Sequence, residues 1–278
     1  MGIPFPFFYK FSALNINSLS ALAEGKAWFS RLADFNDPFE GQFLIKRPDI
    51  ELDKERLFQH MGNTLPRNVL SEPVSEIIRR NYEQSPEGFK KTIEQAISTT
   101  YNRFHSAFQN ISAFCLASDI PNVDASHVSN VMMWSHYADG MKGFCIKFKP
   151  EYLLSSLKEL NEANFNIAQV HYQDEMYNVD FFDLVDLSKN VYTQAIHTKH
   201  TSWEYEYECR IITENPGLYK YSHDAIDSIF IGSKMPLPHQ KILIDICSVN
   251  IPNVDIFSVR THASSYAVEL GKYQKVTK

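Results

Sequence analysis

The stretch from Trp203 to Thr213, WEYEYECRIIT, alternates between apolar and charged residues. This alternation predicts a β-strand, because successive side chains of a strand point to opposite faces. The aromatic and aliphatic face is expected to pack on a core. The opposite face carries Glu204, Glu206, Glu208 and Arg210. Like charges at alternate positions lie roughly 6–7 Å apart and repel each other. The row of acids therefore indicates either a functional site or an exposed sheet face on which the arginine relieves the repulsion.

The composition is that of a folded, acidic protein. The chain has 278 residues, 44% of them hydrophobic, which is enough to bury a large core. Its net charge of −6 gives no basic footprint for nucleic acid. The start of the chain lacks the pattern of a secretory signal, and no apolar run approaches the roughly 18 residues that span a bilayer. Four scattered cysteines show no CxxC spacing. We therefore expect a cytoplasmic protein with reduced cysteines and no membrane segment.

Two short strands are expected near the N-terminus, at Phe7–Ser12 and Lys26–Arg31, with a helix at Leu19–Glu24 between them. Lys10 is the one charged residue of the first strand. In the second strand, Ser30 shares a face with a tryptophan two positions earlier, as the strand period requires.

The second strand is followed by an acidic and aromatic loop, DFNDPFEG, from Asp34 to Gly41. Asn36 and Asp37 can hydrogen-bond the nearby backbone, and the following proline restricts the chain, so the segment predicts a turn. Phe35 adds apolar surface next to these polar groups. The loop is interpreted either as a self-capped turn or as a binding loop beside a cleft.

A helix is expected from Ser126 to Asp139, containing the sequence MMWSHYADG. His136 and Tyr137 lie next to each other on it and form a possible catalytic or ligand-binding pair. The alternative is a buried, hydrogen-bonded histidine without a functional role.

The pattern of elements predicts an α+β fold with a twisted, mostly antiparallel sheet, since strands and helices are mixed without regular βαβ alternation. We expect one domain over residues 1–278. The segment from about 49 to 108 is helical and polar and is expected to be an insertion.

Several common functional motifs are absent. The sequence has no GxGxxG, GxxxxGK[ST], GxSxG or HExxH motif, and it has 10 glycines in all. The closest pair of histidines is His197 and His200, but Lys199 lies between them and no further ligand is in view. No metal site is expected.

Four motifs together carry a resemblance to a known family. They are FNDPFEG, MMWSHYADGMKGFCIKF, WEYEYECRI and IFIGSKM. With them the chain resembles a widespread bacterial family without an assigned function, domain-of-unknown-function family 2971. The resemblance extends from Tyr9 to about Met235, with the helical insertion as its variable part. The family implies no activity.

The order of the parts also resembles the more distant ADP-ribosyltransferase fold. That fold has a polar residue on a first strand, then a helix, then an aromatic- or serine-bearing strand, and much later a strand with Glu-x-Glu. Lys10, Ser30, Glu206 and Glu208 fall in this order. Lys10 stands where the fold usually carries arginine or histidine.

This second resemblance implies an enzyme that cleaves NAD and transfers ADP-ribose to an unknown macromolecule, either protein or nucleic acid. Glu208 would be the catalytic glutamate, and Glu206 would orient or deprotonate the acceptor. Ser30 would brace Glu208, and an aromatic ring such as Phe35 or Tyr137 would stack on nicotinamide. The residues expected to bind NAD are Lys10, Ser30, Phe35, Asn36, Asp37, His136, Tyr137 and Arg210. A toxin or phage-defence role would suit this fold.

Two alternatives remain open at this point. In a metal-independent nuclease, His136 would be the base and Lys10 and Arg210 would bind phosphate. In a protein without enzymatic activity, the acidic face and the loop at Asp34–Gly41 would bind a partner or a nucleotide.

Overall fold

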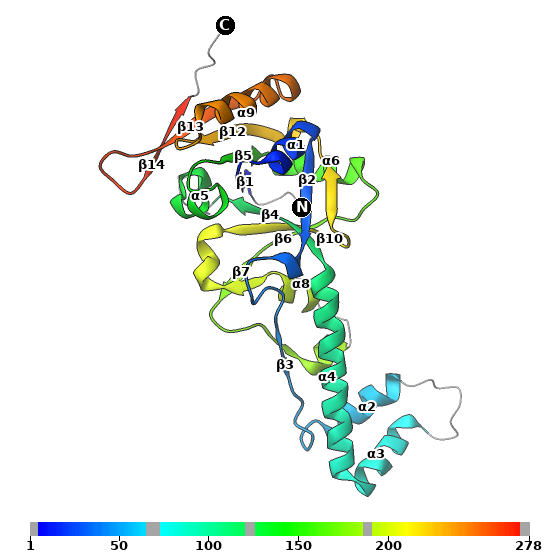
Figure 1. The fold of residues 1–278 in the computed structure, drawn as a ribbon. Helices are drawn as coiled ribbons and strands as arrows, with labels where there is room; N and C mark the ends of the chain where they lie inside the picture. The colour runs from blue at the N-terminus through cyan, green and yellow to red at the C-terminus, as the bar shows by residue number, and fades with distance from the viewer. Residues whose placement is uncertain (1–4, 65–72, 120–125, 186–190, 273–278) are drawn as a thin grey trace. The chain divides into compact units, whose positions relative to one another are not determined.

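The computed structural model describes residues 5–64, 73–119, 126–185 and 191–272. The chain divides into two compact units (Figure 1). The first unit comprises Met1–Pro38, Asn110–Tyr172 and Lys199–Lys278, and the second comprises Phe39–Gln109 and Gln173–Thr198. The segment predicted to be a helical insertion lies in the second unit, and its residues 65–72 fall outside the described residues.

The first unit is built on a sheet that has ten strands in the described part of the chain. The main path through the sheet runs β11-β2-β4-β1-β5-β12-β13-β14, and β10 pairs with β4 and β6. Its strands are β1 (Phe8–Ser12), β2 (Lys26–Arg31), β4 (Ser112–Ser118), β5 (Phe144–Phe148), β6 (Asn166–Gln169), β10 (Glu208–Thr213), β11 (Gly217–Lys220), β12 (Ile226–Gly232), β13 (Asp255–Thr261) and β14 (Val268–Lys272). The pairing of β12 with β13 is parallel, and the other described pairings of this sheet are antiparallel. The predicted α+β class with a mostly antiparallel sheet is confirmed.

Helices bury both faces of this sheet. Helices α1 (Ile16–Glu24), α6 (Pro150–Leu160) and α9 (Leu237–Asn250) contribute leucines to a core shared with β1, β4, β5 and β12. Helix α5 (Val131–Tyr137) packs Trp134 into a second cluster. Short 3₁₀ segments complete the unit: η1 (Leu32–Asp34), η2 (His127–Ser129), η3 (Thr201–Glu206) and η4 (His223–Ala225).

Helix α1 begins earlier than the predicted Leu19, because Asn15 caps it. The Asn15 side chain accepts a hydrogen bond from the Ser18 backbone N–H at 2.9 Å, and the Ser18 hydroxyl oxygen accepts one from the backbone N–H of Asn15. The helix ends, as expected, at Gly25, whose φ of 60° is a left-handed conformation that glycine adopts without strain. The helix thus connects β1 to β2, the two strands that border the site described below.

The second unit contains helices and a small parallel sheet. Its elements are β3 (Leu44–Lys46), α2 (Lys54–Thr64), α3 (Val74–Gln84), α4 (Pro86–Asn110), β8 (Asn178–Asp180), α7 (Phe181–Val185) and α8 (Val191–Ile196). Leu57, Ile93 and Phe182 lie in its core. The short strands β7 (His171–Gln173) and β9 (Thr198–His200) lie where the chain passes between the two units.

The predicted strand from Trp203 to Thr213 is wrong in its first half. Residues up to Glu206 form η3, Tyr207 has a φ of 43° in the left-handed region, and the strand β10 starts at Glu208. A left-handed residue turns the backbone out of the extended path, so the alternation of faces does not continue through it.

Candidate functional site

The site forms where β1 and β2 diverge along β4. Strand β1 pairs with β4 at Ala117 and Ser118, whereas β2 pairs with it at Ser112 and Ala113. Between these two pairings, the residues from Phe114 to Leu116 have no strand partner on the β1 and β2 side of β4 among the described residues. This divergence leaves an opening in the sheet over the middle of β4.

Lys10 crosses this opening from β1. Its Nζ donates a hydrogen bond to the carbonyl oxygen of Cys115 at 2.9 Å, so the unpaired edge of β4 is satisfied by a side chain instead of a strand. The same ammonium lies 5.0 Å from the centre of the Phe114 ring. Lys10 is therefore positioned at the opening by the backbone of β4.

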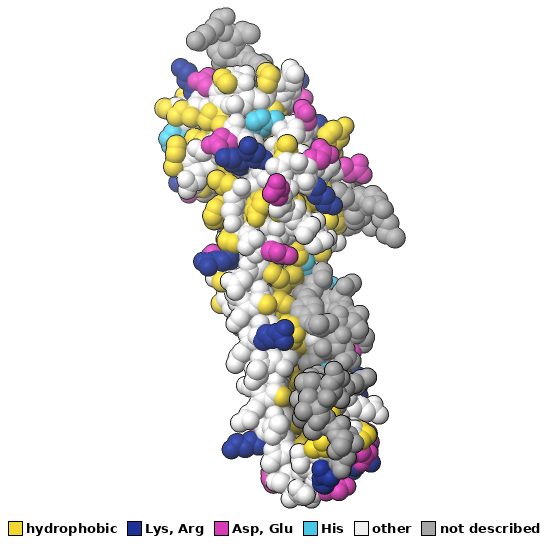
Figure 2. Space-filling model, turned by 90° about the vertical axis from the view of Figure 1, so that its right-hand side faces the viewer, with side chains coloured by type: hydrophobic (Ala, Val, Ile, Leu, Met, Phe, Trp, Pro, Cys, Tyr) yellow, Lys and Arg dark blue, Asp and Glu magenta, His cyan; other side chains and the backbone are white. Residues whose placement is uncertain are grey.

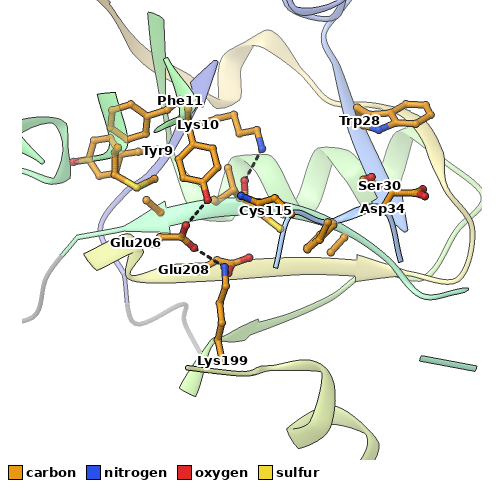
Figure 3. A pocket seen from close by; sticks show the side chains of 17 residues that line it. Tyr9, Lys10, Phe11, Trp28, Ser30, Asp34, Cys115, Lys199, Glu206 and Glu208 are labelled. Carbon is orange, nitrogen blue, oxygen red and sulfur yellow. Dashed lines mark hydrogen bonds and ion pairs between the residues drawn. The ribbon is translucent and has the colours of Figure 1, made fainter. Parts of the chain in front are cut away.

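A cavity of about 270 Å³ occupies the opening, and several separate segments line it. Lys10 comes from β1, Ser30 from β2, Tyr137 from α5, and Glu206 and Glu208 from either side of the η3–β10 junction. Figure 3 shows the Lys10, Glu206, Glu208 and Lys199 side chains around it. Residues that are far apart in the sequence thus share one pocket.

The two glutamates reach the cavity because of the backbone turn between them. Glu206 ends η3, Tyr207 takes the left-handed conformation, and Glu208 opens β10. Their burial rules out the alternative of an exposed sheet face on which the arginine relieves the repulsion: Glu206 and Glu208 are each 4% exposed, and Arg210 is fully buried. The neighbouring Glu204, which does not line the cavity, is exposed.

Four buried charges form one cluster. The Lys199 Nζ lies 2.8 Å from the Oε2 of Glu206 and 3.3 Å from the Oε2 of Glu208. Arg210 binds Glu208 with two groups: its Nε lies 2.8 Å from Oε1 and its Nη2 lies 3.1 Å from Oε2. Two carboxylates thus face two cations, and burying charges is tolerable because each has an opposite charge within hydrogen-bond distance.

The pairing shifts the pKa values of the cluster. Burial by itself would raise the pKa of Glu208, but the charges of Arg210 and Lys199 outweigh burial and hold that pKa well below its usual range. Burial would lower the pKa of Lys199, but Glu208 and Glu206 outweigh it and raise that pKa. Glu208 is therefore ionised and Lys199 is protonated at neutral pH.

The two carboxylates differ in how many hydrogen bonds they already accept. Glu208 accepts from Arg210 twice and from Lys199 once. A carboxylate has about four acceptor positions, so most of those of Glu208 are occupied. Glu206 accepts from Lys199 and from the hydroxyl of Tyr137. Glu206 is therefore the carboxylate that retains more acceptor capacity at the cavity.

Tyr137 is a donor to Glu206 and not a base. Burial, followed by the charge of Glu206, raises the pKa of Tyr137 far above its usual value. The phenol therefore keeps its proton, and it holds the carboxylate of Glu206 in place.

Some predicted site residues line the cavity and others do not. Phe35 and Asn36 line it, together with Lys10, Ser30, Tyr137, Glu206 and Glu208. Asp37 is buried but is not part of the lining. His136 is exposed, bonds the Tyr205 hydroxyl through Nδ1 at 2.8 Å, and does not line the cavity. Arg210 lies behind Glu208, also outside the lining, with its guanidinium 5.6 Å from the centre of the Phe35 ring.

Lys199 is one of the cavity residues that sequence reasoning missed, and Trp28 and Cys115 are others. In the sequence Lys199 stands out only as the residue that lies between His197 and His200. The structure places it 7% exposed, among the two glutamates and 4.4 Å from the Trp203 ring centre. The sequence contains only an indirect indication of it: if two neighbouring glutamates are buried, a cation is required beside them. Nothing in the sequence says which of the 27 lysines and arginines supplies it.

A second cavity of about 630 Å³ adjoins the first. The two share Lys10, Phe11, Trp28 and Tyr137 in their linings. The second cavity continues along α1 and is lined there by Asn15 and other polar residues of the first turn. The two cavities are therefore neighbours in the first unit.

Charge and metal-ligand patterns elsewhere give no competing site. On the face drawn in Figure 2, basic and acidic side chains are interspersed and do not form a field of one sign. A search of the described residues finds no group of three or more histidine, cysteine or acidic side chains that could hold a metal ion.

The comparison with protein families finds one match. The model of a family described as "Protein of unknown function (DUF2971)" matches residues 133–211, which include most of α5, Lys199 and the two glutamates. This match confirms the predicted resemblance over that segment. No curated protein and no solved structure matches the chain. Within the described residues, no helix is both long and apolar enough to cross a membrane.

Proposed function

We propose that the protein is an ADP-ribosyltransferase-like enzyme that breaks the glycosidic bond between nicotinamide and ribose in NAD and transfers ADP-ribose to a macromolecule. One observation carries this proposal: Lys10, Ser30 and the Glu206–Glu208 pair, which match that fold's order of parts along the sequence, line the same cavity. The divergence of β1 and β2 over β4 supports it, because it opens the sheet where those residues meet.

The chemistry suits a cavity with carboxylates. When the glycosidic C–N bond breaks, its electron pair moves to the pyridinium nitrogen, so nicotinamide leaves neutral and positive charge develops on the ribose. A nucleophile of the acceptor then bonds the ribose carbon and loses a proton. A carboxylate fixed beside the developing charge stabilises the transition state, by an amount on the order of a few kcal/mol.

The hydrogen-bond pattern favours a different division of roles from the one that the resemblance implies. Glu208 already accepts three hydrogen bonds from Arg210 and Lys199, so we assign to it the role of anchoring the cluster. Glu206 retains acceptor positions, so we assign to it the contact with the ribose and the stabilisation of its charge.

Aromatic rings and volume also support a nucleotide ligand. Trp28 and Phe35 line the first cavity and offer faces on which a nicotinamide ring can stack. The adjoining cavity of about 630 Å³ along α1 offers room for the rest of the dinucleotide. Small-molecule sites typically occupy about 300–1,000 Å³.

Nicotinamide release from labelled NAD tests the proposal. We expect release by the wild-type protein, a loss of about 100-fold or more in Glu206→Gln, and no change in Glu204→Gln, whose side chain is exposed on the same 3₁₀ segment. Cell extract is added in parallel to supply an acceptor. If the wild-type protein releases no nicotinamide in either condition, the enzymatic proposal is wrong.

The pairing of Glu208 with Arg210 and Lys199 favours one second candidate, a domain that binds a nucleotide without turnover. In that case NAD would raise the melting temperature of the wild-type protein, less so that of Glu206→Gln, and nicotinamide would not be released. The nuclease alternative lacks comparable support, because His136 does not line the cavity.

A further inference from the structure

The ammonium group of Lys199 occupies the position between the two cavity carboxylates. It contacts the Oε2 atoms of Glu206 and Glu208 at 2.8 Å and 3.3 Å, and it is 7% exposed. Figure 3 shows Lys199 reaching both glutamates from one side of the cavity. A place between two carboxylates is where a cationic ligand would gain most from electrostatic attraction. In this structure the protein's own side chain holds that place.

The two cations of the cluster differ in how freely they can leave it. Arg210 is fully buried, does not line the cavity, and holds Glu208 through two hydrogen bonds in a planar fork. Lys199 lines the cavity and holds each carboxylate by a single contact. Lysine is a point charge on a flexible stem, so its ammonium can shift without breaking a bidentate geometry. Lys199 is therefore the cation that a ligand can replace.

We propose that Lys199 is a specificity-determining residue that competes with a cationic ring for Glu206, and that ligand binding moves its ammonium away from that carboxylate. This inference rests on the proposed function, because the positively charged nicotinamide ring of NAD is taken as the competing group. Once the glycosidic bond has broken and the acceptor has bonded the ribose carbon, neither nicotinamide nor the ribose carries a positive charge, so the return of Lys199 to Glu206 favours product release.

A pair of ligands that differ in charge tests this directly. N-methylnicotinamide methylated at its ring nitrogen carries a positive ring, and nicotinamide carries a neutral one. We would measure the affinity of each by calorimetry for the wild type, Lys199→Met and Lys199→Arg. Removing a positive charge next to the ligand is expected to raise the ratio of cation affinity to neutral affinity by about tenfold in Lys199→Met. Lys199→Arg should retain the ratio of the wild type.

The matched control is Lys142→Met, since Lys142 is an exposed lysine of the same unit and does not line the cavity. Its ratio should equal that of the wild type. Thermal unfolding checks that each variant is folded. A ratio that is unchanged or lower in folded Lys199→Met overturns the proposal, as does the failure of both proteins to bind the cation.

A measurement on the wild-type side chain keeps the proposal testable if Lys199→Met does not fold. The Lys199 Nζ lies 4.4 Å from the centre of the Trp203 ring, and Trp203 does not line the cavity. Displacement of Lys199 should therefore change the fluorescence of Trp203. Because Trp28 lines the cavity and can respond to either ligand, the measurement is made in a Trp28→Phe background. There N-methylnicotinamide should produce a change that is lost when Trp203→Phe is added, and nicotinamide should produce none. Equal responses in both proteins would contradict displacement.

These results separate the two proposals. A charge-dependent ratio without nicotinamide release from NAD would support the role of Lys199 and reject the enzymatic function. Nicotinamide release with an unchanged ratio would support the enzymatic function and reject the role of Lys199.

Discussion

Ion pairs of similar length occur in both units, but their burial differs. In the first unit, Arg210 and Glu208 pair at 2.8 Å with the arginine fully buried and the glutamate 5% exposed at its side chain. In the second unit, Arg79 and Glu55 pair at 2.7 Å with side chains that are 43% and 59% exposed. An exposed pair contributes about 0–1 kcal/mol, whereas removing one partner of a buried pair costs about 3–5 kcal/mol. The comparison teaches that burial, and not distance, decides what an ion pair contributes.

The largest effect is expected for Arg210→Met. The substitution leaves the buried Glu208 with one cation in place of two, so we expect the free energy of unfolding to fall by about 3–5 kcal/mol. Urea denaturation of the variant and the wild type measures this difference.

The double variant Arg210→Met with Glu208→Leu tests the cause. Replacing a buried ion pair by apolar groups is often nearly neutral, so the double variant should recover much of the lost stability. If it is no more stable than Arg210→Met, loss of arginine packing and not the unpaired charge would explain the effect.

The second expected effect concerns a titratable side chain that is buried among aromatic rings. His127 is fully buried against the rings of Tyr9, Phe11 and Tyr207, and neither ring nitrogen has a hydrogen-bond partner among the described residues. Burial lowers the pKa of His127 to about 4. Below the unfolded pKa of about 6.5, the unfolded chain binds a proton that the folded protein does not.

Stability should therefore fall between pH about 6.5 and about 4, by about 3 kcal/mol at most from this group. Urea denaturation across this range should show a smaller fall in His127→Phe. The loss of stability that comes from Glu208 occurs at lower pH. Because folding lowers the pKa of Glu208, its ionised form stabilises the protein fully above the unfolded pKa of about 4.3, and this stabilisation is lost as the pH falls through the folded pKa. An identical profile for His127→Phe above pH 4 would show that this histidine is not the group responsible.

The smallest effect is expected for Arg79→Met in the second unit. Its pair with Glu55 is exposed and screened by salt, so the free energy of unfolding should change by less than about 1 kcal/mol. Urea denaturation at low and at high salt measures the loss of unfolding free energy in Arg79→Met and in Arg210→Met for comparison. A loss as large as that of Arg210→Met would break the comparison between the two units.

Local patterns predicted the scaffold of the site well. The strand at Lys26–Arg31 was predicted at its observed bounds, and the predicted end of α1 at Gly25 is confirmed. Both depend on neighbouring residues: the alternation of side chains and the left-handed conformation open to glycine. The junction at Tyr207 was not predicted, because a left-handed tyrosine has no marker in its own sequence.

The sequence by itself determined the α+β class, the family resemblance, and the presence of two glutamates two residues apart at a candidate site. These follow from residue types and short spacings. The tertiary structure decided that both glutamates are buried, that Arg210 holds Glu208 through two hydrogen bonds, and that Lys199 lies between the two. Charge pairing depends on which distant segments the fold brings within about 4 Å, and burial sets the strength of each pair. Neither quantity can be obtained from spacing along the chain.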